Sequence, residues 1–298
     1  MEQNKVFIVH TYFDTVVVIP VGPGTHVPFV ADTINSFIFF AEGSFKFIIA
    51  DDSHQALGVQ LQKLFPSADI LVTEKPMGGW AGLYINLANT YRHALKNYSF
   101  KILLKLDTDA LVIGYLEKEI IHFFEKNTTV GMAGQYPNDY HGKPWDIGWP
   151  KARVLNGATN WRYIKRPVTN WFLRKIYLTA KENGYRAGES VFGGAYAFSY
   201  VCLKKMQTEG LLPFRVFGRL NMGEDHIFSL LVKYIGFDLG SLSEGHQPFA
   251  LAWKGLPASP EVLVKQGKKI IHSTRFWQDQ KEENIRQYFR ELRQSVRA

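Results

Sequence analysis

The first half of the chain alternates short apolar runs with segments whose apolar residues recur at helical spacing. The apolar runs cover residues 15–21, 46–50, 69–73 and 101–106, and their β-branched and aliphatic composition predicts strands. Helical spacing predicts helices over residues 32–42, about 57–65 and about 83–96, with Pro66 ending the second. Strands that alternate with helices predict a mainly parallel sheet covered by helices on both faces.

The pattern changes in the second half. Residues 136–174 are rich in Trp, Tyr, Pro, Gly and Asn with little periodicity, which is typical of a lid or binding loop. Helices are predicted over residues 173–183 and 225–235. A C-terminal helix is predicted from Asp279, with a capping-box-like Glu282 three residues on and one apolar stripe made of Ile285, Phe289, Leu292 and Val296.

Tryptophan is concentrated in the irregular segment, as Trp145, Trp149, Trp161 and Trp171. Those near Asp146 and Arg162 either form a platform for a sugar ring or pack an irregular subdomain. Trp80, after Gly78 and Gly79, either borders a ligand pocket or packs a helix start. The sequence leaves these alternatives open.

Composition and charge narrow the class of protein. The net charge is +8, but the 35 Lys and Arg are spread along the chain without a dense block, which argues against a nucleic-acid partner. The charge fits an anionic small ligand and weak attraction to an anionic membrane face.

Cys202 is the only cysteine, which excludes an intrachain disulfide and a multi-cysteine zinc site and favours a reducing cytoplasm. Neither a signal-peptide pattern nor a membrane-spanning run is recognisable, so we expect a cytoplasmic protein, compatible with peripheral association with a membrane.

The pair Asp107 and Asp109 ends the strand predicted over residues 101–106. Side chains two apart along a strand point to the same side, and two carboxylates held together need a cation to offset their repulsion. Such a pair also occurs as a helix cap or in a solvent-exposed turn, but the apolar runs before and after it favour a metal site. The turns at residues 22–25, 51–53 and 107–109 follow predicted parallel strands, so they should meet at one sheet edge, where ligands bind.

At these residues the chain resembles the GT-A superfamily of nucleotide-sugar-dependent glycosyltransferases. The strand ending at Pro20 and the strand ending in Asp51-Asp52 are similar to the start of its largest bacterial group. The later order of Asp107-Thr-Asp109, Phe192-Gly-Gly-Ala-Tyr196 and Gly223-Glu-Asp225 is similar to inverting β-1,3-glycosyltransferases. The resemblance covers most of residues 15–277.

The resemblance implies roles for the residues that match. Asp109 would bind Mn²⁺ or Mg²⁺ directly, and Asp107 would reach the metal or the ribose. Pro20, Asp51 and Asp52 would lie near the nucleotide. Gly193 and Gly194 match the family's glycine loop, whose bare backbone lets donor sugar and acceptor approach closely.

The last motifs of the resemblance bear on catalysis. An inverting transfer needs a base, and Asp225 matches that position, with Glu224 binding donor or acceptor hydroxyls. Acids at a helix start are also favourable caps, so this interpretation depends on the upstream acid pair. His272 resembles the C-terminal histidine that completes the metal site, and Arg275 could meet the diphosphate because arginine fits phosphate oxygens in a fork geometry.

The resemblance therefore implies a single GT-A domain over residues 1–298. Residues 1–135 would form the nucleotide-binding half, residues 136–277 the acceptor-binding half, and residues 278–298 a C-terminal amphipathic helix. The implied activity is transfer from a nucleotide sugar, by family a UDP-sugar, to a hydroxyl of a carbohydrate or glycolipid, as in polysaccharide biosynthesis, with inversion.

Three alternatives remain open at this point. The same fold hosts retaining transferases. It also hosts sugar nucleotidyltransferases, although their glycine-rich loop continues with Thr-Arg, whereas here Thr25 is followed by His26. A non-catalytic carbohydrate-binding homologue is the third, although every expected acidic position is filled.

Overall fold

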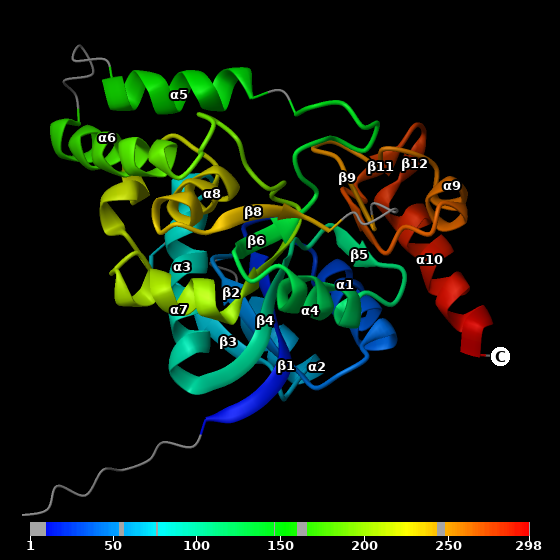
Figure 1. Ribbon diagram of the computed structural model, residues 1–298. Helices are drawn as coiled ribbons and strands as arrows, with labels where there is room; N and C mark the ends of the chain where they lie inside the picture. The colour runs from blue at the N-terminus through cyan, green and yellow to red at the C-terminus, as the bar shows by residue number, and fades with distance from the viewer. Residues whose placement is uncertain are drawn as a thin grey trace, which may run out of the picture.

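The computed structural model describes residues 10–53, 57–75, 77–145, 147–159, 166–242 and 248–297. Strands from both halves of the sequence pair in a seven-stranded sheet, and a three-stranded sheet and a two-stranded hairpin lie beside it (Figure 1). Asp146, Trp161 and Arg162, named above, lie outside the described residues.

The large sheet has the strand order β3-β2-β1-β4-β7-β6-β8. Strands β3, β2, β1 and β4 run parallel, whereas β7 is antiparallel to both of its neighbours and β8 is parallel to β6. The predicted mainly parallel sheet is confirmed. The bounds are β1 Thr11–Val21, β2 Phe45–Asp51, β3 Asp69–Val72, β4 Tyr98–Leu106, β6 Val130–Gly134, β7 Ala195–Ser199 and β8 Asp238–Ser241.

Helices cover both faces of this sheet because buried side chains alternate along its strands. On β1, Val17 and Ile19 belong to one apolar core, and Val16 and Val18 belong to another on the opposite face. The first core is closed by α1 Val27–Phe40, α2 Leu57–Leu64 and α4 Glu117–Lys126. The second is closed by α3 Ala81–Asn97, α5 Gly148–Thr159, α6 Pro167–Glu182, α7 Tyr200–Thr208, the 3₁₀ helix η1 Arg215–Arg219 and α8 Glu224–Tyr234.

The small sheet continues directly from the end of β4. It has the order β5-β10-β9, with β10 antiparallel to β5 and parallel to β9. A third apolar core, including Leu111, Ile271, Ile285 and Phe289, packs it against the C-terminal helix. The bounds are β5 Ala110–Val112, β9 Phe249–Leu251, α9 Pro260–Lys265, β10 Ile270–His272, β11 Phe276–Trp277, β12 Gln280–Lys281 and α10 Glu282–Arg297.

Two helix starts differ from the prediction. Helix α1 begins at Val27 rather than residue 32, and α6 begins at Pro167 rather than near residue 173. Both have proline in the first turn, where its fixed φ suits a helix and its missing N–H costs nothing. The segment 136–174, predicted as irregular, contains α5. Its buried Val154 and Ala158 lie four residues apart, so packing supports a helix that the composition conceals.

The predicted start of the C-terminal helix is wrong. Asp279 lies in the turn between β11 and β12, and α10 begins at Glu282. The Glu282 carboxylate accepts hydrogen bonds from Arg286 and Thr274 and forms no capping box. Val296, predicted in the apolar stripe, is 62% exposed, so the buried stripe ends at Leu292.

Across the described ranges, no helix combines the length and the apolar composition that crossing a bilayer requires.

Candidate functional site

Asp107 and Asp109 lie in the link between β4 and β5, where the chain leaves the large sheet for the small one. His272 ends β10 opposite Ala110, so strand pairing places it beside Asp109. One potential ligand atom from each of Asp107, Asp109 and His272 lies within 4.8 Å of the other two. His272 Nε2 is 3.2 Å from Asp109 Oδ1 and 3.7 Å from Asp107 Oδ2. The three residues singled out as metal ligands therefore lie together.

The orientation of His272 suits a metal ligand. Its Nδ1 is 2.9 Å from the carbonyl oxygen of Ala252, the residue after β9. A backbone carbonyl can only accept, so Nδ1 carries the proton and donates, and Nε2 faces the two carboxylates. Burial alone would lower the pKa of His272, but the charges of Asp109 and Asp107 outweigh burial and raise it. Without a cation, a proton on Nε2 offsets the negative charge of the pair.

Asp109 is the most firmly held member of the group. Its Oδ2 accepts from Ser273 Oγ at 2.7 Å and pairs with Arg275 Nε at 2.9 Å, and its carbonyl oxygen accepts from Thr274. Burial would raise its pKa, but His272, Ser273 and Arg275 together lower it. Arg275 reaches Asp109 through Nε while its side chain remains 66% exposed, so part of the guanidinium faces solvent.

A buried lysine that the sequence analysis missed connects the two acid motifs. Lys105 has no exposed side-chain surface, and its Nζ is 2.6 Å from Asp107 Oδ1 and 3.3 Å from Glu224 Oε1. Burial would lower the pKa of Lys105, but Asp107 and Glu224 raise it to about 12, so it is a permanent cation. Burial raises the pKa of Asp107, against the opposing charges of Lys105 and His272. The available signal was a lysine two residues before Asp107, on the same side of the strand and within its apolar C-terminal part Ile102–Leu106.

The glycine loop packs directly against these residues. The Gly193 carbonyl accepts from Lys105 Nζ, and the Gly194 carbonyl accepts from the Asp107 N–H at 3.0 Å. A β-carbon on Gly194 would lie 2.5 Å from His272 Cγ and Nδ1. A β-carbon on Gly193 would lie 3.2 Å from carboxylate oxygens of both Glu224 and Asp225. The two glycines therefore let the metal group and the Glu224-Asp225 motif approach one backbone segment.

Glu224 and Asp225 form the first turn of α8 but differ in environment. Glu224 is buried, and burial raises its pKa to about 7, against the opposing effect of Lys105. Asp225 is half-buried, and its Oδ1 accepts from the N–H of His226 at 2.8 Å. Its Oδ2 faces the glycine loop. The motif therefore starts a helix, as acids favourably do, and a catalytic role for Asp225 remains a prediction.

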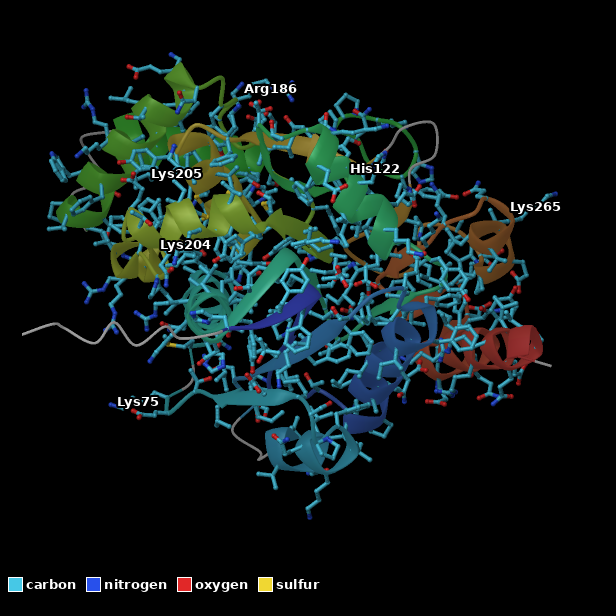
Figure 2. The ribbon with its side chains drawn as sticks, turned by 60° about the horizontal axis from the view of Figure 1, so that its bottom comes forward. Lys75, His122, Arg186, Lys204, Lys205 and Lys265 are labelled. Carbon is cyan, nitrogen blue, oxygen red and sulfur yellow. The ribbon has the colours of Figure 1, made fainter. Side chains whose placement is uncertain are left out.

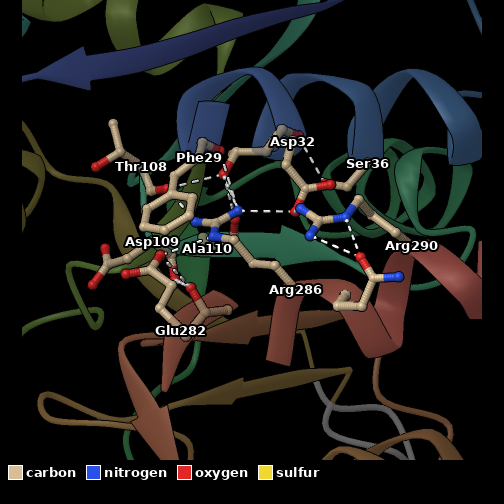
Figure 3. A network of polar contacts seen from close by, with 12 residues as sticks. Phe29, Asp32, Ser36, Thr108, Asp109, Ala110, Glu282, Arg286 and Arg290 are labelled. Carbon is tan, nitrogen blue, oxygen red and sulfur yellow. Dashed lines mark hydrogen bonds and ion pairs between the residues drawn. The ribbon is translucent and has the colours of Figure 1, made fainter. Parts of the chain in front are cut away.

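The C-terminal helix also holds the link between β4 and β5 that carries Asp107 and Asp109, which we call the metal loop. Arg286 is fully buried and donates from Nη2 to the Thr108 carbonyl at 2.7 Å and from Nη1 to Asp32 Oδ2 at 3.1 Å (Figure 3). Its Nε donates to Glu282, which also accepts from Thr274. Helix α10 thus contacts both the link between Asp107 and Asp109 and the segment after His272.

Asp51 and Asp52 bind backbone groups. Asp51 accepts from the N–H groups of Ser53 and Gly58, the latter in the first turn of α2. Asp52 accepts from Thr73 Oγ1 at 2.7 Å and from the N–H groups of Met77 and Gly78. Pro20 is buried on β1 beside Ala50. These three residues lie at the ends of adjacent parallel strands, the edge that the sequence predicted, and a role in nucleotide binding remains a prediction.

Three of the tryptophans named above, Trp145, Trp80 and Trp149, lie in two places. Trp145 stacks on Phe192 with ring centroids 4.5 Å apart, and Phe192 in turn lies 5.9 Å from His272. Trp80 and Trp149 contact each other, and both are half-exposed. Trp145 therefore lies next to the glycine loop. The platform hypothesis stays open for Trp145 and Trp149, and the ligand-pocket hypothesis stays open for Trp80.

No family model matches this chain, and no curated protein matches it. Among solved structures it is similar to a mannosyltransferase from Pyrobaculum calidifontis described in complex with GDP-mannose and Mn²⁺, with 11% identity, TM-score 0.41, and coverage of 77% of this chain and 55% of that one. It is also similar to the bifunctional glycosyltransferase WbbM, with 9% identity, TM-score 0.48, and coverage of 96% and 50%. A third similarity is to TarS of S. aureus, with 14% identity, TM-score 0.44, and coverage of 85% and 38%. The chain spans about two fifths to just over half the length of these structures, and at such identities the similarity concerns the fold alone.

Proposed function

We propose that this protein is a metal-dependent glycosyltransferase that moves a sugar from a nucleotide sugar to a hydroxyl acceptor. The observation that carries the proposal is the meeting of Asp107, Asp109 and His272 within 4.8 Å, beside a glycine loop that also contacts Glu224 and Asp225. A cation site and a carboxylate base next to one bare backbone segment meet the requirements of glycosyl transfer.

The donor set fits Mn²⁺ or Mg²⁺. Carboxylate oxygens suit both ions, and the single imidazole nitrogen of His272 favours Mn²⁺. A bound divalent cation would stabilise the charge that develops on the diphosphate as it leaves. Ser273 and Arg275 hold Asp109, and Ala252 orients His272, so the ligands are positioned in advance.

Asp225 is the proposed base. The acceptor oxygen would attack the anomeric carbon, its proton would pass to Asp225, and the bond from that carbon to the diphosphate oxygen would break, with inversion. The Asp225 Oδ2 that faces the glycine loop, beside the buried Glu224, supports this role. Glu224, bonded to Lys105, would bind a hydroxyl of donor or acceptor.

The nucleotide is proposed to lie at the edge formed by Pro20, Asp51 and Asp52. Asp52 organises the loop that carries Met77 and Gly78, and this loop would border the base or ribose. Asp107 reaches the metal or ribose, and the exposed part of Arg275 is free to meet the diphosphate. A UDP-sugar remains the proposed donor, on the resemblance of the motifs.

The acceptor is proposed to be a carbohydrate or a glycolipid, bound by residues 136–277, with residues 1–135 binding the donor. Polysaccharide biosynthesis in the cytoplasm is the setting that this chemistry suggests.

A turnover assay tests the proposal. The protein is incubated with Mn²⁺, a panel of UDP- and GDP-sugars and simple glycoside acceptors, and nucleoside diphosphate release is measured with the anomeric configuration of the product. We expect inversion in wild type, loss of turnover with retained nucleotide binding in Asp225→Asn, and no change in the control Asp279→Asn, an exposed acid in the β11–β12 turn.

Each other outcome identifies one alternative. Retained configuration would remove Asp225 from the base role. Pyrophosphate release from a nucleoside triphosphate and a sugar phosphate would indicate a nucleotidyltransferase. Carbohydrate binding without turnover would indicate a non-catalytic homologue.

A further inference from the structure

The positive charge of this protein is unevenly distributed. Residues 166–219 contain nine Lys or Arg and three Asp or Glu, which leaves 26 and 24 for the rest of the chain. The basic residues form no continuous block in the sequence, because apolar residues that pack into the core separate them. In the fold these residues belong to α6, α7, η1 and the loops that join them (Figure 1).

Helix α6 carries exposed apolar side chains opposite its buried face. Leu173, Ile176 and Ala180 pack into the core below it. On the outer side Val168 is 62%, Trp171 60% and Leu178 45% exposed. These three positions recur at helical spacing, so they form one stripe rather than scattered exposures.

Basic residues border this stripe. Arg174, Lys175 and Lys181 are exposed on the same helix, and the only acid of α6 is Glu182 at its end. The neighbouring η1 adds exposed Arg215 and Arg219. It is held against α6 by the edge-to-face contact of Phe172 with Phe214 at 5.2 Å. Arg166, the residue before α6, is exposed as well. Within the described ranges, none of these six basic side chains forms an ion pair with an acid of the protein.

We propose that this surface, the α6 face (Val168, Trp171, Arg174, Lys175, Leu178 and Lys181), docks on an anionic lipid bilayer. Lys and Arg that lack acidic partners attract anionic headgroups, and each one near the bilayer surface contributes to the free energy of binding. An exposed tryptophan flanked by aliphatic side chains suits the boundary between headgroups and acyl chains. A purely polyanionic partner would account for the basic residues but not for the apolar stripe between them.

The α6 face shares no residue with the metal group, the glycine loop or the Glu224-Asp225 motif. Membrane docking is therefore independent of the proposed transferase reaction, and binding can be measured without any substrate.

Vesicle binding tests the proposal directly. The purified full chain is sedimented with vesicles of phosphatidylcholine alone and with vesicles in which part of this lipid is replaced by phosphatidylglycerol. We expect binding only to the anionic vesicles, decreasing with added salt. Arg174→Glu with Lys175→Glu should weaken it at least about tenfold. The charge-matched control Lys75→Glu with Lys265→Glu, at exposed positions that Figure 2 shows at other ends of the molecule, should weaken it far less.

A second readout separates a bilayer from other polyanions. Brominated phosphatidylcholine in the anionic vesicles should quench tryptophan fluorescence in wild type and much less in Trp171→Phe, which keeps an aromatic side chain at that position. Absence of binding to anionic vesicles would overturn the proposal, as would equal weakening by the control pair. Vesicle binding without quenching, together with equally tight binding to a homopolymeric RNA, would show a general polyanion surface instead.

Discussion

At the residue scale, the site is a closed arrangement of charges. Lys105 and a protonated His272 lie on either side of Asp107, and Asp109 pairs with His272 and Arg275. A cation that enters this arrangement replaces one of its positive charges, the proton on His272 Nε2. The metal and the proton therefore compete for one atom.

The affinity for Mn²⁺ should consequently rise with pH. Asp109 and Asp107 raise the pKa of His272 above its ordinary value near 6.5, so the metal-free site holds this proton more firmly than an ordinary histidine does. Titration calorimetry in buffers of different ionisation enthalpy should show release of about one proton per ion below that pKa. The variant His272→Gln should bind more weakly and lose most of this pH dependence. Equal affinity at pH 6 and pH 8 in wild type would contradict the competition.

Gly194 should be intolerant of even one methyl group. In Gly194→Ala the new β-carbon would lie 2.5 Å from the His272 ring, and β7 and the ring cannot both keep their places. We expect at least about a tenfold loss of Mn²⁺ affinity, measured by electron paramagnetic resonance of the free ion. The matched control is Gly22→Ala, where a β-carbon meets nothing within 4 Å. Unchanged affinity in Gly194→Ala would show that the imidazole does not bind the metal.

Sequence could predict the acids and His272 because charged residues that follow apolar runs are visible in one dimension. It could not show that Lys105 is buried between two acid motifs, since Glu224 is more than one hundred residues away. The positions of Gly193 and Gly194 were predicted from the motif, but their proximity to Asp225 of α8 and His272 of β10 arises only in the folded chain.

At the element scale, α10 acts as a brace for the metal loop. Two of its arginines, Arg286 and Arg293, are buried, and both bind Asp32 of α1. The sequence predicted the apolar stripe of this helix but missed Arg286, which lies next to Ile285 and seven residues before Arg293. That spacing repeats the apolar stripe and could have indicated that both arginines face inward.

Replacing Arg286 by lysine should weaken metal binding, although Arg286 is not one of the proposed metal ligands. In Arg286→Lys the charge is kept, but one ammonium group cannot reach the Thr108 carbonyl, Asp32 and Glu282 together. We expect a loss of about 1–3 kcal/mol in unfolding free energy and a weaker Mn²⁺ affinity in the fraction that stays folded. Arg290→Lys on the same helix, where the guanidinium is partly exposed, is the control. Loss of stability with unchanged metal affinity would show that Arg286 supports only the fold.

At the scale of the whole molecule, the large sheet was predictable in its parallel half and not in the rest. Strands β1 to β4 have strong apolar runs, whereas β7, β6 and β8 extend the sheet beyond β4 in an order that no local pattern contains. Helix α5 was missed because its packing on the core, rather than its composition, supports it.

The edge strand β3 should make the fold sensitive to acid. Burial alone would raise the pKa of Asp69, but contacts from Lys46 at 2.7 Å, Tyr98 at 2.6 Å and His93 at 2.9 Å lower it below the ordinary value. The folded state thus binds its proton less readily than the unfolded state, so this stabilisation is present above pH 4 and is lost as the pH falls through the lowered pKa. Asp69→Asn should cost about 1–2 kcal/mol in urea unfolding at pH 7 and progressively less below pH 4. A constant difference across this range would rule out the charged contacts as its source.

The most direct test of the central claim is nucleotide-sugar binding with and without Mn²⁺, measured by thermal shift on wild type and on Asp109→Asn. A ligand that binds only the folded state raises the melting temperature. We predict that at least one nucleotide sugar raises it in the presence of Mn²⁺, that chelation of the metal removes the effect, and that Asp109→Asn does not show it. A shift of equal size without metal, or in Asp109→Asn, would contradict the claim that Asp107, Asp109 and His272 hold the cation that binds the donor.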